Sequence, residues 1–216
     1  MKVILTGTTG MVGEGVLLEC LDNIKVSNVL SISRKPCNIQ HPKLKELLVP
    51  DFTELDKFTD EIQGYDACFY CAGISSVGMN EAKYSFITYD TTISFAKVIL
   101  TVNPQITFCF ISGNHTDSSE KGKLMWARIK GKTENALMRM GFKEQYNFRP
   151  GGMLPWSQQK NVKPLYTLVV KIFKFFTPSK VLSLSDVGKA MINVVGNDFQ
   201  NKIFEIEEMR IVAKNN

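Results

Sequence analysis

Three glycines near the start of the chain, Gly7, Gly10 and Gly13, have the spacing of a turn that holds the diphosphate of a dinucleotide. They lie in the run Thr6-Gly7-Thr8-Thr9-Gly10-Met11-Val12-Gly13, between an apolar stretch at 3–5 and apolar residues at helical spacing. In such a strand–turn–helix unit the glycines permit a tight turn, close approach of the pyrophosphate, and close packing of the helix. The first N–H groups of the helix then face the phosphates. We therefore predict dinucleotide binding here; the alternative is a glycine-rich connection without a ligand.

The end of the second predicted strand, Ser33-Arg34-Lys35, bears on which dinucleotide is bound. About 20 residues after the glycine turn, NAD-selective proteins usually place Asp or Glu to accept hydrogen bonds from the ribose 2′-hydroxyl, whereas Arg suits the 2′-phosphate of NADP. Arg34, with Lys35 in support, therefore favours NADP over NAD. The alternative is a solvated basic pair at the end of a strand.

Two further positions follow predicted strands and could contact the cofactor. Asp51 could accept a hydrogen bond from the adenine amino group and Phe52 could pack on the ring, although an ordinary turn Asp explains the sequence nearly as well. Ala72 and Gly73 end the fourth predicted strand, where a small residue lets the backbone lie against the cofactor.

Strands and helices alternate along most of the chain. We expect a first strand at 3–5, further strands at 28–33, 47–49, 66–72, 106–111 and 146–148, and helices at 53–62, 81–102 and 122–140. This alternation predicts an α/β fold with a doubly wound, mainly parallel sheet, whose ligands bind beyond the carboxyl ends of the strands. We interpret residues 1–216 as a single dinucleotide-binding domain, with a core of about 1–150 and a small region of about 151–216 on the substrate side.

The alternation weakens after Leu154. Residues 165–176 are apolar apart from Lys171 and Lys174 and a few polar residues, and we favour a helix that covers the substrate side of the cleft. The alternative is a helix that binds a membrane surface or a partner. Its basic face is too sparse for stable membrane anchoring, which argues against this alternative. Ser185 and Asp186 are expected to cap a helix at 187–195, and residues 202–206 to form a last strand.

The composition is that of a globular protein, with 44% hydrophobic and 22% charged residues among 216. The net charge of +5 does not require a nucleic-acid partner, because lysines scattered over a surface account for it. No apolar run reaches the ~18–20 residues of a membrane span, and the chain enters a predicted strand directly, so we expect neither a span nor a signal peptide.

Five cysteines in mostly apolar segments favour a reduced, cytoplasmic protein with buried thiols. Cys68 and Cys71 form a C-x-x-C within a predicted strand, where positions three apart point to opposite faces. A metal or redox site needs convergent ligands, so we predict no metal.

Taken together, these segments resemble the short-chain dehydrogenase/reductase superfamily in its atypical branch, and within it the Tat-interacting-protein-like group of NADPH-binding proteins. The resemblance covers nearly the whole chain. It rests on the glycine run and on Ser33-Arg34, Asp51-Phe52-Thr53-Glu54-Leu55, Gly64-Tyr65-Asp66, Cys71-Ala72-Gly73, Lys130-Gly131-Lys132-Thr133-Glu134 and Phe148-Arg149-Pro150-Gly151. It implies an NAD(P)-binding Rossmann fold with NADP as the cofactor. It also implies cofactor contacts at Thr8, Thr9, Met11, Val12, Cys71, Lys130, Pro150 and Gly151.

The resemblance further implies a catalytic set of Ser, Tyr and Lys, with Tyr and Lys in Y-x-x-x-K on one helix. The Tyr transfers the proton, the Lys lowers the Tyr pKa and binds the nicotinamide ribose, and the Ser holds the substrate oxygen. Ser112 and Lys130 match, but Trp126 stands in the Tyr position. An indole N–H donates a hydrogen bond but is no practical acid near neutral pH, so Trp126 either packs against the sheet or stacks on a substrate.

Three functions fit these residues. The first is an NADP(H)-dependent reductase of a small carbonyl-type substrate that uses Ser112, with a water or His115 in place of the Tyr; Asn114 and His115 could also simply form the turn after Ser112. The second, favoured by Trp126, is a non-catalytic NADP(H)-binding regulatory protein with a partner on its C-terminal surface. A nucleotide-sugar epimerase or dehydratase ranks lower, because only 66 residues follow Pro150. The sequence leaves the substrate, the partner and the oligomeric state open.

Overall fold

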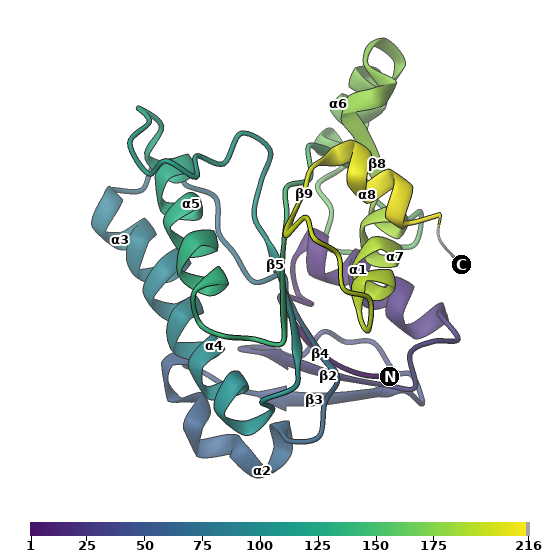
Figure 1. Ribbon diagram of the computed structural model, residues 1–216. Helices are drawn as coiled ribbons and strands as arrows, with labels where there is room; N and C mark the ends of the chain where they lie inside the picture. Colours follow the sequence, from purple (N-terminus) through teal and green to yellow (C-terminus); the bar gives the residue numbers. More distant parts are fainter. Residues whose placement is uncertain (215–216) are drawn as a thin grey trace.

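The computed structural model describes residues 1–214, and a parallel sheet forms its centre (Figure 1). Within these residues, seven strands pair in the order β3-β2-β1-β4-β5-β6-β9, each parallel to its neighbour. Their bounds are Lys2–Thr6 (β1), Asn28–Ser33 (β2), Leu44–Leu48 (β3), Ala67–Tyr70 (β4), Thr107–Ile111 (β5), Glu144–Phe148 (β6) and Ile203–Phe204 (β9). The predicted α/β fold with a doubly wound parallel sheet is confirmed.

Helices cover both faces of the sheet (Figure 1). Neighbouring strand residues point into different apolar layers. Leu5 and Phe69 face the layer that packs under α1 (Met11–Asp22), α7 (Leu184–Val194) and α8 (Ile206–Val212). Ile4 and Cys68 face the opposite layer, which packs against η1 (Phe52–Phe58), α2 (Thr59–Ile62), α4 (Thr91–Val102) and α5 (Met125–Met138). A parallel sheet that is buried on both faces requires strands that are apolar throughout, as the sequence shows.

The helix predicted at 81–102 forms as one helical path with a wide turn inside it. It consists of α3 (Glu81–Ser85), the π-helical turn η2 (Phe86–Asp90) and α4. Asn80 caps the start, because its side chain accepts a hydrogen bond from the Lys83 N–H at 2.9 Å. The π turn is relevant to function because Phe86, Ile87 and Thr91 reach the cavity described below.

The chain after β6 returns partly to the sheet and partly forms a small separate unit. In that unit β7 (Gly152–Leu154) pairs with β8 (Val181–Ser183), and α6 (Pro164–Phe176) and η3 (Pro178–Lys180) lie between them in sequence. Figure 1 shows α6 projecting away from the sheet. β9 then extends the sheet, while α7 packs on α1 so closely that a Cβ at Gly188 would lie 2.7 Å from the Glu19 side chain.

Several predicted boundaries were wrong for local reasons. The third strand spans Leu44–Leu48 rather than 47–49, because its polar residues lie on an exposed edge strand, which hides the strand pattern. The segment 53–62 is a 3₁₀ helix and one α turn with a kink at Glu54. α5 begins at Met125, since the Gly122 N–H is instead bonded to the Asp117 carboxylate at 2.6 Å.

Near the C-terminus the predicted cap and last strand also differ. Ser183, not Ser185, caps α7: its hydroxyl accepts from the Asp186 N–H, and the Asp186 carboxylate accepts from the Ser183 N–H. β9 covers only two residues of the predicted 202–206, and the chain then turns into α8.

Candidate functional site

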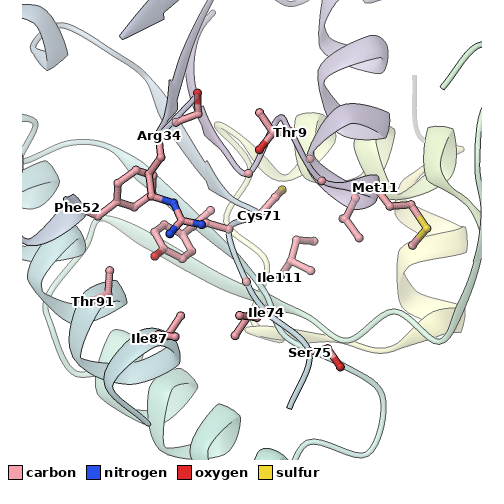
Figure 2. Close-up of a pocket in the computed structure, with 18 of the residues that line it drawn as sticks. Thr9, Met11, Arg34, Phe52, Cys71, Ile74, Ser75, Ile87, Thr91 and Ile111 are labelled. Atoms are coloured by element: carbon pink, nitrogen blue, oxygen red, sulfur yellow. The ribbon is translucent and has the colours of Figure 1, made fainter. Parts of the chain in front are cut away.

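A cavity of about 860 Å³ opens at the carboxyl edge of the sheet beside β1 and β4. The strand order reverses here, since the chain from β1 runs to β2 on one side and the chain from β3 returns to β4 on the other. Figure 2 shows side chains from these strand ends and from the helical segment opposite them around the cavity. Of the residues predicted from sequence, those that line it are Gly7, Thr9, Gly10, Met11, Val12, Gly13, Ser33, Arg34, Asp51, Phe52, Cys71, Ala72, Gly73, Ser112, Lys130 and Pro150.

The glycine turn after β1 is shaped by contacts that leave no room for side chains. Gly7 has φ +76°, and a Cβ there would lie 2.6 Å from the Cys71 carbonyl oxygen. A Cβ at Gly13 would lie 2.1 Å from the Gly7 carbonyl oxygen, so Gly13 allows α1 to approach the turn itself rather than the sheet. The Thr6 hydroxyl accepts the N–H groups of Cys71 and Ala72 at 3.1 and 3.0 Å and so joins the two strand ends.

The start of α1 faces the cavity with unpaired backbone donors. Gly10 is the N-cap, and the first helical hydrogen bond runs from Glu14 N–H to Gly10 C=O, so the N–H groups of residues 11–13 have no helical acceptor. Such donors, together with the helix dipole, favour an anion. Thr8 does not line the cavity: it is fully buried and its hydroxyl is 2.7 Å from that of Ser31.

The cavity wall beside β2 and β3 carries the predicted adenosine-side residues. Figure 2 shows the Arg34 side chain extending into the cavity beside Phe52. The Asp51 carboxylate accepts the N–H and hydroxyl of Thr53 at 2.9 and 2.7 Å, and these hydrogen bonds lower the pKa of Asp51. Lys35 is exposed and does not line the cavity.

Ser112 lies just beyond the end of β5, on the β4 side of the point where the strand order reverses. Its hydroxyl group is hydrogen-bonded to another hydroxyl. Its Oγ is 2.9 Å from Thr116 Oγ1, and Thr116 donates its single hydroxyl proton to the Gly113 carbonyl at 2.7 Å. Ser112 must therefore be the donor to Thr116. In this arrangement the Ser112 hydroxyl offers the cavity lone pairs and no proton.

Lys130 is the lysine among the described residues that line the cavity, and it lies beside Ser112. From α5 its Nζ donates to the carbonyls of Ser112 and Ile111 at 3.0 and 3.3 Å, which leaves a third N–H for the cavity. Burial lowers the pKa of Lys130 to about 8, with the Glu134 carboxylate acting in the opposite direction. The group is therefore protonated at neutral pH and can release its proton more easily than an ordinary lysine.

The other residues predicted around the reaction centre lie outside the lining. Trp126 is half-buried, and its ring would be 3.7 Å from a Cβ at Gly113, so it packs behind the loop after Ser112. His115 is exposed with φ +66°, and the Asn114 N–H bonds to the Pro150 carbonyl, as expected of turn residues. Gly151 packs under Ile206, where a Cβ would lie 2.8 Å from its side chain.

No substitute for the missing Tyr was found among the described residues. Among the described residues, Tyr70 is the only tyrosine that lines the cavity. Its side chain is 2% exposed, and burial raises the pKa of Tyr70 well above the usual range. A buried phenol with a raised pKa does not release a proton near neutral pH.

A buried ion pair, without a role in the sequence predictions, fixes this end of the site. The guanidinium of Arg149, after β6, donates to Glu134 on α5, to Glu205 at 3.2 Å and to Ser118 at 2.5 Å. Glu134 is fully buried one helical turn after Lys130. The pair therefore connects the turn at Pro150 to the helix that carries Lys130. Such a pair depends on which segments meet in space, which the sequence alone does not show.

The sequence predictions also missed part of the lining, namely Pro50, Tyr70, Ile74, Ser75, Phe86, Ile87, Thr91, Ile111, Gly113 and Met153. Most of these are apolar and belong to helix faces or loops, where an apolar residue normally indicates packing. Helix α6 contributes no described residue to the lining, so the predicted cover over the substrate side is not formed by α6.

The cysteines of residues 1–214 form no disulfide and no metal site. All five cysteines are free, and Cys68 and Cys71 face opposite apolar layers, as predicted. In that part of the chain no group of His, Cys, Asp and Glu is arranged to hold a metal ion. No helix in the same range combines the length and apolar content needed to cross a bilayer.

Comparison with known proteins gives a consistent result. The model of the NAD dependent epimerase/dehydratase family matches residues 3–118. The chain is 22% identical over 236 residues to leucinostatins biosynthesis cluster protein T of Purpureocillium lilacinum, covering 92% of this chain and 86% of that protein. It is 24% identical over 155 residues to protein HTATIP2 of Rattus norvegicus, covering 71% and 63%. The crystal structure of the Bordetella bronchiseptica enzyme WbmF in complex with NAD⁺ has a similar fold, with a TM-score of 0.68, 13% identity, and coverage of 98% of this chain and 76% of that one.

Proposed function

Because the chain belongs to the NAD dependent epimerase/dehydratase family, in the atypical branch of the short-chain dehydrogenase/reductase superfamily, we propose that it is an NADP(H)-dependent reductase of a small, apolar carbonyl compound. The observation that carries the proposal is one cavity shared by the glycine turn, Arg34, Ser112 and Lys130. We also propose that residues 1–216 act as one domain, with the cofactor held mainly by 1–150.

The backbone around the cavity fits a dinucleotide. The unpaired N–H groups at the start of α1 would bind the pyrophosphate. A Cβ at Gly73 would meet no atom within 4 Å, and one at Gly10 only the Gly7 carbonyl oxygen at 3.4 Å, so both glycines leave the cavity open for a ligand. When bound, NADPH would supply a hydride to the carbonyl carbon of the substrate.

Arg34 would select NADP over NAD by binding the 2′-phosphate. Asp51 is the carboxylate of the cavity lining, and its Oδ1 is already engaged by Thr53 at the start of η1. A guanidinium in the cavity and a carboxylate engaged elsewhere favour a phosphate over a ribose 2′-hydroxyl.

We assign the proton transfer to Lys130, in place of the Tyr of related enzymes. Ser112 gives its proton to Thr116, and His115 lies outside the lining, so neither of them donates to a substrate oxygen. Lys130, whose Nζ is 3.0 Å from the Ser112 carbonyl oxygen, is the donor that we assign to this end of the cavity. Lys130 would give its proton to the carbonyl oxygen of the substrate as the carbonyl carbon is reduced, and the neutral amine would then regain a proton from water. The low pKa of Lys130 suits this role near neutral pH.

The lining also limits the substrate. Among the described lining residues, Arg34, Asp51 and Lys130 are the charged ones, and Ile74, Phe86, Ile87 and Met153 add large apolar side chains to the lining. A lining of this kind favours an uncharged aldehyde or ketone with an apolar substituent.

The test is a fluorescence titration with NADPH and NADH, followed by measurement of NADPH oxidation with a panel of apolar aldehydes and ketones. We expect tighter binding of NADPH and a turnover that is lost in Lys130→Met. Absence of NADPH binding would disprove the proposal as a whole.

A second candidate is an NADP(H)-binding protein without turnover, which Trp126 favours because the usual acid is missing. It predicts NADPH binding with no oxidation in any carbonyl screen. Epimerase chemistry on a nucleotide sugar has less support, since few residues follow Pro150 to hold a bulky substrate.

A further inference from the structure

Helix α6 exposes an unusual number of large apolar side chains. Leu165, Leu168, Ile172, Phe175 and Phe176 are each more than half exposed, with Phe175 at 83% and Phe176 at 74%. Val170 is the buried residue of this 13-residue helix. Isolated exposed apolar residues are common on proteins, but a continuous patch of this size indicates a binding surface.

The apolar residues form one stripe along α6. At about 100° per residue, those five side chains fall within an arc of roughly 100°, and Lys171 and Lys174 lie beyond one edge of it, by about 40° and about 100°. The helix is held from another side, because the Tyr166 hydroxyl bonds to the N–H and carbonyl of Met153 at 3.2 and 3.1 Å. The stripe therefore stays exposed while the helix is anchored to β7.

The surroundings of the stripe are positively charged. Residues 145–185 contain five lysines and Arg149 but no Asp or Glu. The lysines 160, 163, 171, 174 and 180 are all exposed, and none of them forms an ion pair with a residue in the described part of the chain. Arg149 is buried against Glu134 and does not contribute to this surface.

These charges distinguish between possible occupants. A second copy of the chain, docked symmetrically, would bring the same lysines together and be repelled. An anionic lipid surface attracts them, while an apolar stripe of aromatic and aliphatic side chains enters the headgroup boundary. Lysines beside the stripe can keep their ammonium groups among the headgroups while their alkyl chains follow the helix.

We propose that α6 is an interfacial helix that binds the chain to membranes rich in anionic lipids. At about 20 Å its length suits a helix that lies in the surface rather than across the bilayer. The surface does not include the cavity, since no described residue of α6 lines it. The inference is therefore independent of the proposed reductase function.

The test is co-sedimentation of the full chain with phosphatidylcholine vesicles, with and without phosphatidylserine. We expect binding only with phosphatidylserine, and loss of that binding on addition of salt. The variant Phe175→Ser/Phe176→Ser should no longer sediment. Lys171→Glu/Lys174→Glu should bind about tenfold or more weakly, since each lysine near such a surface contributes roughly fivefold.

Matched controls keep the test interpretable. Lys121→Glu/Lys123→Glu makes the same charge change at exposed lysines away from α6, and Ile24→Ser removes an apolar side chain that is 97% exposed. Both should bind like the native chain, and circular dichroism should show that every variant is folded. Equal binding of all variants, or no binding by the native chain, would disprove the proposal. Self-association that is lost in Phe175→Ser/Phe176→Ser, without vesicle binding, would assign the surface to a second copy instead.

Discussion

The pH dependence of carbonyl reduction should reveal whether Lys130 is the proton donor. The donor must be protonated, and burial lowers the pKa of Lys130 from 10.5 to about 8. The rate at low substrate should therefore be level below pH 7 and fall about tenfold for each pH unit above 8. At pH 9 roughly a tenth of the enzyme would remain active. An ordinary lysine would show no such fall until well above pH 9.

Two substitutions at this position separate charge from proton transfer. Lys130→Arg keeps a positive charge but holds its proton at every accessible pH, and Lys130→Met removes both. Each should lower kcat/KM by about 10²–10⁴-fold, the usual contribution of a general acid. The small activity left in Lys130→Arg should no longer fall above pH 8. Lys132→Arg, at an exposed site on the same helix, is the matched control and should leave the profile unchanged.

The assay is the initial rate of NADPH oxidation, followed by absorbance in buffers from neutral to alkaline pH at constant ionic strength. NADPH affinity is measured in parallel, because loss of cofactor binding would imitate loss of the acid. A level profile through pH 9 in an active native enzyme, or an active Lys130→Met variant, would show that the proton comes from another group.

Three other changes test the remainder of the site. Arg34→Ala should weaken NADPH binding by roughly ten- to a hundredfold and leave NADH binding nearly unchanged, measured by calorimetry; equal loss for both would show that Arg34 does not contact the 2′-phosphate. Trp126→Tyr should raise carbonyl reduction by restoring a phenol four residues before Lys130, and a slower variant would argue for a substrate contact by Trp126. Gly13→Ala should abolish binding of both cofactors in a fluorescence titration, because its Cβ would lie 2.1 Å from the Gly7 carbonyl oxygen; unimpaired binding would contradict the proposed turn.

The fold could be predicted from sequence because its signals are local. Strands such as Ala67–Tyr70 and Thr107–Ile111 are apolar throughout, which is how a strand buried on both faces reads. The edge strand Leu44–Leu48 was misplaced, since its exposed residues follow no such pattern. The cap of α7 was misplaced by two residues because Ser183 and Ser185 are chemically alike, and only the path of β8 decides between them.

The site could be predicted where backbone geometry dictates residue type, and less well elsewhere. The glycine turn and Arg34 follow directly from their spacing after strands, and the structure brings both to one cavity. The order of proton donors from Ser112 to Thr116 to the Gly113 carbonyl, and the burial that lowers the pKa of Lys130, depend on distances that no spacing rule contains. Met153 reaches the cavity from β7, a strand of three residues that carries no sequence signal.

Because of the π turn at Phe86–Asp90, the shape of the cavity depends on the number of residues in this turn and not only on which side chains line the cavity. A wider turn rotates the chain less per residue, so Tyr84, Thr88 and Thr92, four positions apart, all stay buried. The same widening leaves Ile87 and Thr91 on the cavity side. Losing one residue here would restore an ordinary helix and turn everything before it by about 100° relative to α4. Relatives that share every side chain of the site but differ by one residue in this turn would therefore accept differently shaped substrates.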